Sequence, residues 1–390
     1  MKPLIGILAV SALVYRAWAR RSLTLLGLVV AGVSATMHAL HPWSTPFLLL
    51  AVFYYGGTKA TKVKHDVKAR LTLSATGADG GEGPRNHIQV LANSLVATVL
   101  SIAHAAVLAK NPADSCFSFG QSAADILMVG IVAYGAHFPF NYAAVASDTF
   151  SSELGILSKS KPRLITSLTL REVPPGTNGG VTATGLAAGL LGSFTIALTS
   201  AIFLPFCSDS SGIRDRVIWT VALSSWGLLG SVLDSLLGGL LQASVVDKRS
   251  GKVVEGSGGR KVNLDIVSRV ACSPTCKLLT VTQVLIHPGS TKPAVASGLT
   301  SSAVTSSTHL RETESVANAA TLRGSRATGT SVGSQPGRAH DESHESRRVE
   351  TGHDWLDNNG VNMLMAVSMS VGAMAIAQWV WGIELRELWA

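Results

Sequence analysis

The chain has 390 residues, of which 47% are hydrophobic and only 14% are charged, and its mean hydropathy is +0.33. Soluble domains carry roughly 25% charged residues, so this composition excludes an ordinary soluble protein and indicates an integral membrane protein. The net charge of +8 gathers in alternate loops, which is typical of a membrane-orientation signal and gives no reason to expect a nucleic-acid partner.

Apolar runs close to the ~20 residues needed to cross a bilayer recur along the chain. They predict an all-α polytopic membrane helix bundle with about eight transmembrane helices. The predicted spans are 3–18, 22–40, 46–57, 88–109, 124–147, 181–206, 217–243 and 361–382. The third span is short, which leaves a re-entrant or tilted segment open.

The first apolar segment has two interpretations. A small-residue pattern at 17–19 fits the cleavage site of a signal peptide. Three arginines, Arg16, Arg20 and Arg21, are more typical of the cytoplasmic flank of a membrane anchor.

Basic residues follow every odd-numbered predicted span, whereas the loops after even-numbered spans are nearly neutral. The positive-inside rule therefore places the basic loops in the cytoplasm and both termini on the opposite side. Cys116 and Cys207 fall in two non-cytoplasmic loops and could form a disulfide, which the sequence leaves open. Cys272 and Cys276 have no second ligand pair nearby, so we do not expect a zinc site there.

Composition divides the chain into four parts. Residues 1–245 hold the first seven spans, residues 246–288 form a cytoplasmic loop with a possible small hairpin, and residues 353–390 hold the last span and the C-terminus. Residues 289–352 are rich in Ser, Thr, Gly and Ala and show no sustained periodicity. Such a segment buries too little apolar surface to order itself, so we expect a disordered cytoplasmic insertion.

Two carboxylates, Asp148 and Glu153, follow the fifth predicted span, where a charge is costly unless it faces water, a partner or an ion. At about 100° per residue, one face of this helix would carry Tyr134, His137, Asn141, Asp148 and Ser152. Glu153 lies about 100° to 160° from members of that face, so it can join Asp148 only if the helix unwinds. The stripe is either a packing seam or, at Asp148, a functional site.

The seventh predicted span repeats this pattern around Asp234. Three small residues share its face within about 60°, namely Gly227, Ser231 and Gly238. Such a stripe admits either a neighbouring helix or a ligand. Packing alone does not require the aspartate.

The fourth predicted span opens with a polar stripe that starts in a cytoplasmic loop. Arg85, Gln89 and Asn93 are spaced four residues apart and share one helix face. Arg85 is the candidate for holding a phosphate. The lysines upstream are interpreted as an orientation signal that also attracts anionic lipids.

A glycine-rich turn from Pro174 to Gly180 precedes a helix that is predicted to begin near Val181. Backbone N–H groups at a helix start bind anions, and glycines let a phosphate come close. The turn lacks the G-x4-G-K-[ST] pattern of a P-loop. A plain connection between helices explains the same residues equally well.

These segments, in this order, carry a family resemblance. The matching runs are Ser22-Leu23-Thr24, Arg85 with Gln89-Val90 and Asn93, Ser147-Asp148-Thr149 with Ser152-Glu153-Leu154-Gly155, Pro162 to Thr166, Val173 to Val181, Gly230-Ser231 with Asp234 to Gly238, and Asp357-Asn358-Asn359 with Val361-Asn362. Together they resemble the transmembrane protein 19 family over most of 20–260 and 354–382. The insertion between those ranges has no counterpart in the family pattern.

The resemblance implies an activity, because the family includes plant proteins that look like phytyl-phosphate kinases. Its acidic and glycine-rich elements are also similar to those of CTP-dependent lipid kinases. It therefore implies phosphoryl transfer from CTP, or another nucleoside triphosphate, to an isoprenoid (phytyl or polyprenyl) phosphate at a cytoplasm-facing site. Phosphoryl transfer needs positioning and charge neutralisation and no protein nucleophile.

The resemblance also implies roles for individual residues. Mg²⁺ would be held by Asp148, Glu153 and Asp234. The nucleotide and phosphate groups would be bound by Lys159, Lys161, Arg163, Gly176, Thr177, Asn178, Gly179, Gly180, Arg85, Gln89 and Asn93. Weaker candidates on the acceptor side are Asn358 and Asn362.

Two other functions stay open. An ion-coupled transporter that uses Asp148 and Asp234 would predict broken helices in two related halves, and the sequence shows no such symmetry. A non-catalytic membrane scaffold would use residues 289–352 to recruit partners. The expected partners are membrane lipids and an isoprenoid phosphate, and the default location is the endoplasmic reticulum or another endomembrane. The oligomeric state stays open.

Overall fold

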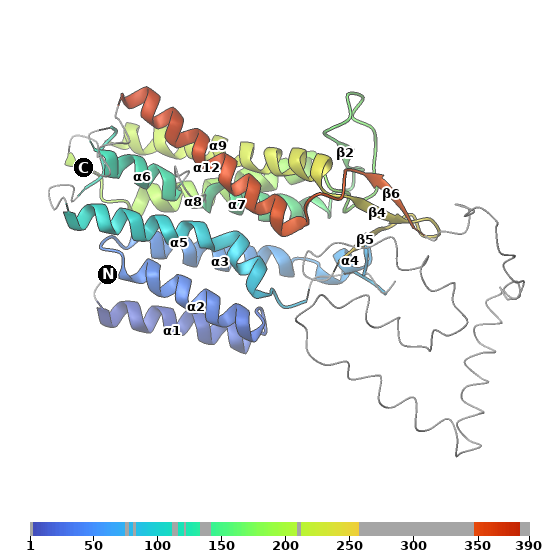
Figure 1. Cartoon of the computed structure of the whole chain (residues 1–390), viewed down its shortest axis with the longest axis horizontal. Helices are drawn as coiled ribbons and strands as arrows, with labels where there is room; N and C mark the ends of the chain where they lie inside the picture. Colours follow the sequence, from blue (N-terminus) through green and yellow to red (C-terminus); the bar gives the residue numbers. More distant parts are fainter. Residues whose placement is uncertain are drawn as a thin grey trace, which may run out of the picture. The chain divides into compact units, whose positions relative to one another are not determined.

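The computed structural model describes residues 3–74, 78–80, 83–110, 116–120, 122–132, 142–208, 212–256 and 347–382. These residues belong to one of the two units into which the chain divides, Met1–Val262 with Arg347–Ala390. Helices in this unit run side by side, and a small sheet adjoins one end of them (Figure 1). The predicted helical membrane fold is confirmed, with a small sheet that the sequence did not indicate.

Ten helices are formed by the described residues. In chain order they are α1 (Pro3–Ala19), α2 (Leu25–Leu40), α3 (Thr45–Lys62), α4 (His65–Ala69), α5 (His87–Lys110), α6 (Ala123–Val132), α7 (Tyr142–Gly155), α8 (Ala183–Phe203), α9 (Ile213–Leu241) and α12 (Asn358–Trp381). Four of these, α5, α8, α9 and α12, are long and apolar enough to cross a membrane, and α1 and α2 are shorter apolar helices.

Two helices differ from the predicted spans. α3 has 18 residues and continues to Lys62, so it is not the short segment that the sequence suggested. Lys59 and Lys62 lie in its last turn, where a positive charge complements the helix dipole and does not stop the helix. The fifth predicted span corresponds to α6 and α7, and Tyr134, His137 and Asn141 lie outside the described residues.

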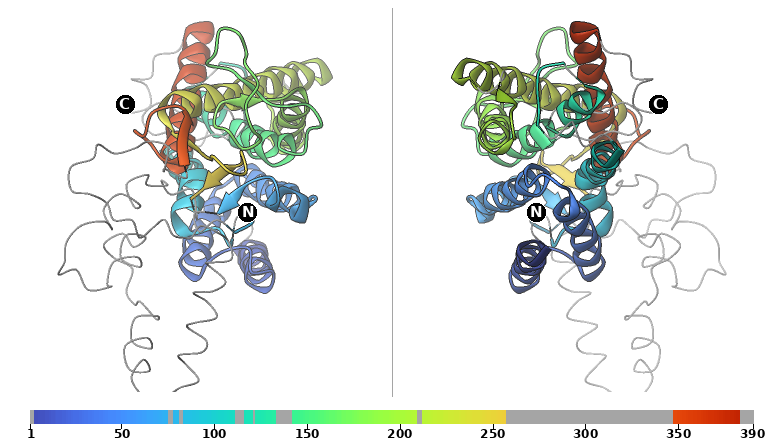
Figure 2. Two further views of the ribbon diagram at one scale, coloured as in Figure 1. Left: turned by 90° about the vertical axis from the view of Figure 1, so that its right-hand side faces the viewer. Right: turned by 90° about the vertical axis from the view of Figure 1, so that its left-hand side faces the viewer.

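Glycines set the close packing of α7 against α8 and α9. A Cβ added at Gly192 would lie 2.6 Å from the Ala146 carbonyl oxygen, and one at Gly230 would lie 2.2 Å from the Ala144 Cβ. Small residues at such contacts let helix backbones approach within a membrane. Viewed along the helices, α1 to α3 gather on one side and α7 to α9 on the other, and α3 packs directly against α7 and α8 (Figure 2).

The sheet has the strand order β1 (Leu73–Ser74), β5 (Val253–Glu255), β4 (Ser244–Asp247) and β6 (Arg347–Thr351). β4 is antiparallel to both β5 and β6, and β1 is parallel to β5. The hairpin β4–β5 thus crosses the predicted boundary at residue 245. The apolar stretches near 278–286, where a hairpin seemed possible, lie outside the described residues.

Strand β6 corrects the predicted extent of the insertion. Residues 347–351 were placed in the disordered segment 289–352 because their composition is polar. Backbone pairing with β4, about a hundred residues earlier in the chain, orders them, and composition does not report such a long-range partner. Residues 257–346 lie outside the described residues, so the disorder expected of 289–346 stays a prediction.

The opposite end of the bundle carries a disulfide between Cys116 and Cys207, which the sequence had left open. Cys207 precedes the start of α9, whereas the sheet follows the end of α9, so the two features lie at opposite ends of that helix. Disulfides persist in oxidising compartments. The bond therefore supports the predicted orientation, with the sheet on the cytoplasmic side.

Candidate functional site

Asp148 and Asp234 meet between α7 and α9, with their carboxyl groups in hydrogen-bonding contact. The contact follows from the helix packing. Because Gly230 lacks a Cβ, α9 touches α7 at Ala144. One helical turn further along each helix brings Asp148 opposite Asp234.

A third helix reaches the same place through Asn362 of α12. With its side-chain amide oriented to donate, the nitrogen lies 3.2 Å from Oδ1 of Asp234 and 3.0 Å from the Asn358 carbonyl oxygen; that orientation is assigned from the hydrogen bonds. Asp357 caps α12 by accepting from the Gly360 N–H at 2.8 Å. The capped helix start thus presents Asn362 to Asp234, while Asn358 acts through its backbone.

The absence of a cationic partner among the described residues sets this pair apart. Both residues are half-buried, and the ion pairs of the described residues include neither Asp148 nor Asp234. Two carboxylates in contact are unfavourable unless they share a proton or a cation. Ser231, one turn before Asp234, has a buried hydroxyl without a hydrogen-bond partner among the described residues. The pair is therefore suited to take up a cation.

Mg²⁺ fits this donor set, because it is often bound through one or two carboxylates together with substrate phosphates and water. Within the part of the chain that the structure describes, no group of three or more His, Cys, Asp or Glu side chains gathers as a metal site. The predicted set of three carboxylates is thus not assembled. Asp148 and Asp234 remain as the candidate ligands.

Glu153 is occupied elsewhere. α7 stays helical to Gly155, so the unwinding that would bring Glu153 to Asp148 does not occur. Its carboxylate lies 2.5 Å from the Lys68 Nζ and accepts a hydrogen bond from the Thr61 hydroxyl at 2.6 Å. Lys68 is only 9% exposed and also donates to two carbonyl oxygens of α3. Glu153 therefore neutralises a buried lysine.

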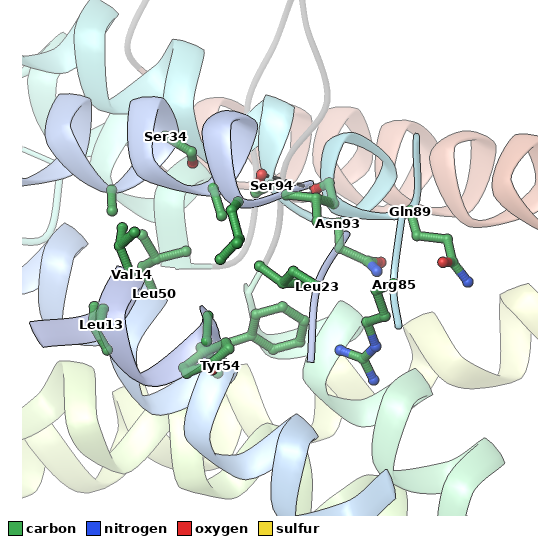
Figure 3. A pocket seen from close by; sticks show the side chains of 16 residues that line it. Leu13, Val14, Leu23, Ser34, Leu50, Tyr54, Arg85, Gln89, Asn93 and Ser94 are labelled. Atoms are coloured by element: carbon green, nitrogen blue, oxygen red, sulfur yellow. Dashed lines mark hydrogen bonds between the residues drawn. The ribbon is translucent and has the colours of Figure 1, made fainter. Parts of the chain in front are cut away.

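Arg85 lies between this ion pair and the first three helices. Its guanidinium donates to the Thr61 hydroxyl at 3.0 Å and lies 3.9 Å from Glu153. Its backbone N–H donates to the Ser22 carbonyl oxygen at 3.1 Å, and its carbonyl oxygen accepts from the Thr24 N–H at 3.0 Å. The Ser22-Leu23-Thr24 run therefore holds the arginine in place. Gln89 and Asn93 of α5 lie beyond it, and all three residues line one pocket (Figure 3).

The predicted basic residues after α7 are exposed to solvent. Lys161 and Arg163 share Glu172, at 3.4 Å and 3.7 Å, across the base of the loop that leaves β2 (Arg163–Leu164). Lys159 is also exposed. Exposed pairs of this kind contribute little stability, so these side chains can exchange partners readily.

The glycine-rich turn is closed by its own contacts. The N–H groups of Thr177 and Gly180 donate within the turn, and that of Asn178 donates to the Ser244 hydroxyl at 2.9 Å. Gly179 has a φ of 79°, and a Cβ there would lie 2.8 Å from the Gly239 Cα. These contacts favour the plain connection over a phosphate cradle, because three of the N–H groups of the turn have protein acceptors and packing explains Gly179.

Two residues of this region, Lys68 and Thr61, were not singled out from the sequence. Lys68 lies in a run of basic residues and resembles its solvated neighbours. Nothing in the local pattern distinguishes the one lysine that folds back onto Glu153, because its partner lies 85 residues further along the chain. The contact depends on tertiary packing alone.

Residues 8–370 match the family described as integral membrane protein DUF92. Protein PGR of Arabidopsis thaliana is 37% identical over 247 residues, which are 63% of this chain and 80% of that protein. Protein VTE6, chloroplastic, of the same plant is 31% identical over 180 residues, 45% of this chain and 47% of that protein.

A third relative comes from an archaeon. The uncharacterized membrane protein MJ0933 of Methanocaldococcus jannaschii is 38% identical over 143 residues, 34% of this chain and 55% of that protein. No solved structure matches the chain. The matches support the family resemblance that the sequence motifs indicated.

Proposed function

The chain belongs to the DUF92 family of integral membrane proteins, and on that premise we propose that it is a Mg²⁺-dependent kinase that phosphorylates an isoprenoid monophosphate. CTP is the proposed donor, and the reaction takes place at the cytoplasmic membrane face. The observation that carries the proposal is the contact between the carboxyl groups of Asp148 and Asp234, which have no cationic partner among the described residues.

Each nearby side chain has a task in this reaction. Asp148 and Asp234 hold the metal, and the Asn362 amide orients Asp234 by donating to its Oδ1. Bound Mg²⁺ supplies charge neutralisation to the nucleotide phosphates. Arg85 supplies N–H donors to the acceptor phosphate, since a guanidinium binds phosphate with two parallel hydrogen bonds.

The chemistry balances without a protein nucleophile. An oxygen of the acceptor monophosphate forms a bond to the γ-phosphorus of the nucleotide. The bond between that phosphorus and the β–γ bridging oxygen breaks, and the nucleoside diphosphate leaves. The product is an isoprenoid diphosphate. The protein contributes positioning and electrostatic stabilisation, which dominate catalysis of phosphoryl transfer.

The test is a transfer assay with full-length protein purified in detergent. CTP, and then ATP, labelled at the γ-phosphate are supplied with phytyl, geranylgeranyl or farnesyl monophosphate. We expect labelled diphosphate product, and a loss of about 10²-fold or more in Asp148→Asn and Asp234→Asn. Asp66→Asn is the matched control, because the Asp66 side chain is 97% exposed.

Absence of product with every donor and acceptor, from protein that unfolds cooperatively, would overturn the proposal. So would product formation that Asp148→Asn leaves intact. In the first case the carboxylate pair would point to ion transport, which flux measurements in proteoliposomes would detect.

A further inference from the structure

A largely apolar pocket lies between the first three helices and α5, apart from the carboxylate pair (Figure 3). Its empty volume, with the open solvent at its mouth, is about 720 Å³. α1 contributes Leu13 and Val14, α2 contributes Leu28 and Ala31, and α3 contributes Phe53. Such a wall favours an apolar ligand, because it offers few hydrogen-bonding groups.

The polar groups of this pocket gather at one end. Arg85 and Asn93 lie together there, whereas Leu13, Val14 and Ser34 lie at the other end (Figure 3). Among the described residues, Thr61 is the one hydrogen-bond acceptor found for the Arg85 guanidinium, which carries five N–H donors and lies 3.9 Å from Glu153, a carboxylate already held at 2.5 Å by Lys68. The Asn93 amide has no hydrogen-bond partner within the same part of the chain. This end therefore has donors available for an anion.

The length of the pocket follows from α2. Leu23, which pairs with Arg85 in an isolated β-bridge, lines the pocket before α2 begins, and α2 lines it from Leu28 to Ala35. At 1.5 Å per residue the α2 part alone extends for roughly 10 Å. It is an elongated apolar space with a cation at one end, which complements a long apolar chain that ends in an anion.

We propose that this pocket binds the acceptor lipid as a single-chain phosphate monoester, with the phosphate on Arg85 and Asn93 and the chain against α1 and α2. This inference rests on the proposed function, in which this lipid accepts the transferred phosphoryl group. The binding itself requires no catalysis. Ala31, whose side chain is small, sets the chain length that the pocket accepts.

The experiment measures binding of lipid phosphates to the full-length protein in detergent, without nucleotide or Mg²⁺. The probes are geranyl, farnesyl and geranylgeranyl monophosphate. Two comparison ligands are geranylgeraniol, which lacks the phosphate, and inorganic phosphate, which lacks the apolar chain. Dioleoyl phosphatidic acid serves as the phosphate monoester with two chains. We expect geranylgeranyl monophosphate to bind at least about tenfold more tightly than geranylgeraniol, inorganic phosphate or phosphatidic acid.

Ala31→Phe tests the chain-length inference. A larger side chain there shortens the pocket, so affinity for geranylgeranyl monophosphate should fall about tenfold while affinity for geranyl monophosphate changes less than about threefold. Val29→Phe is the matched control, because Val29 lies on the same helix and is 57% exposed. If Ala31→Phe does not fold, Ala31→Leu makes the same comparison with a smaller side chain.

Arg85→Gln tests the polar end. It should weaken every monophosphate about tenfold and leave geranylgeraniol unchanged. Equal affinity for the alcohol and the monophosphate, equal affinity for phosphatidic acid, or identical behaviour of Ala31→Phe and Val29→Phe would each overturn the inference. Asp148→Asn should bind the lipid normally, so a failed kinase proposal and a failed pocket proposal give different results.

Discussion

The two acidic sites on α7 have opposite electrostatic environments. Glu153 is held by a buried lysine at 2.5 Å, a threonine hydroxyl and an arginine. Asp148, five residues earlier, faces a second carboxylate and the amide of Asn362. A compensated carboxylate stabilises the fold, whereas two carboxyl groups in contact without a cationic partner favour the sharing of a proton or a cation. The comparison teaches that the partners of an acid, and not its place in a motif, decide whether it can bind metal.

The largest change in stability is expected when Glu153 is substituted. Glu153→Gln leaves Lys68 as a buried charge without its counter-ion, so the free energy of unfolding should fall by about 3–5 kcal/mol. Thermal unfolding in detergent measures the change. The double variant Glu153→Gln/Lys68→Met should recover most of it. If the single variant is as stable as the parent, Glu153 is not the partner that neutralises Lys68.

A smaller effect is expected from the helix contact that brings the aspartates together. Gly230→Val places its side chain against Ala144, where a Cβ already comes within 2.2 Å. Such overpacking should cost about 1–3 kcal/mol of unfolding free energy and weaken Mg²⁺ binding by separating Asp148 from Asp234. Gly83→Ala is the control, because nothing lies within 4 Å of the added Cβ. Unchanged metal affinity in Gly230→Val would show that this contact does not position the pair.

Removing the insertion should test whether the aspartate site depends on it. β5 and β6 flank β4 and run parallel to each other, so their connection needs a crossover of about a dozen residues. A Gly/Ser linker of about 12 residues in place of 257–346 should keep the fold and stabilise it by about 1–2 kcal/mol through lower loop-closure entropy. A two-residue linker should prevent β6 from pairing.

Kinase activity should survive the longer linker, because Asn362 and the sheet are preserved. Loss of activity in a well-folded protein with that linker would favour the scaffold interpretation, in which the insertion recruits partners.

The smallest change in stability is expected from Asp148→Asn without metal. Removing one of two contacting carboxylates relieves repulsion, so the free energy of unfolding should stay the same or rise by up to about 1 kcal/mol. Parent protein should gain about 2.7 kcal/mol with Mg²⁺ and CTP at a hundred times their dissociation constant, and the variant should not. A large destabilisation of metal-free Asp148→Asn would mean that the pair is a structural hydrogen bond.

Much of the bundle could be predicted from the sequence, because long apolar runs and alternating loop charge are local signals. The aspartates could be found singly, each as a charge on an apolar helix. Their mutual contact could not, since it depends on Gly230 meeting Ala144 across two helices. The same limit applies to Lys68 with Glu153 and to β6 with β4, whose partners are distant in sequence. The sequence predicted Asn362 only as a weaker candidate on the acceptor side. Its contact with Asp234 was not predicted.

The glycine-rich turn illustrates a different limit. Gly179 is required by its positive φ and by close packing on Gly239, and a phosphate-binding loop would require glycine for similar reasons. Residue type alone therefore does not separate the two explanations. The hydrogen bonds of the turn separate them, because three of its N–H groups already have protein acceptors.

The most direct test of the central claim is Mn²⁺ binding measured by electron paramagnetic resonance, with Mn²⁺ as a substitute for Mg²⁺ and CTP present. Parent protein, Asp148→Asn, Asp234→Asn and Glu153→Gln are compared at equal folded concentration. We predict that both aspartate variants lose at least about tenfold in Mn²⁺ affinity, while Glu153→Gln keeps the parent affinity. Loss of affinity in Glu153→Gln, with affinity retained in the aspartate variants, would contradict the account.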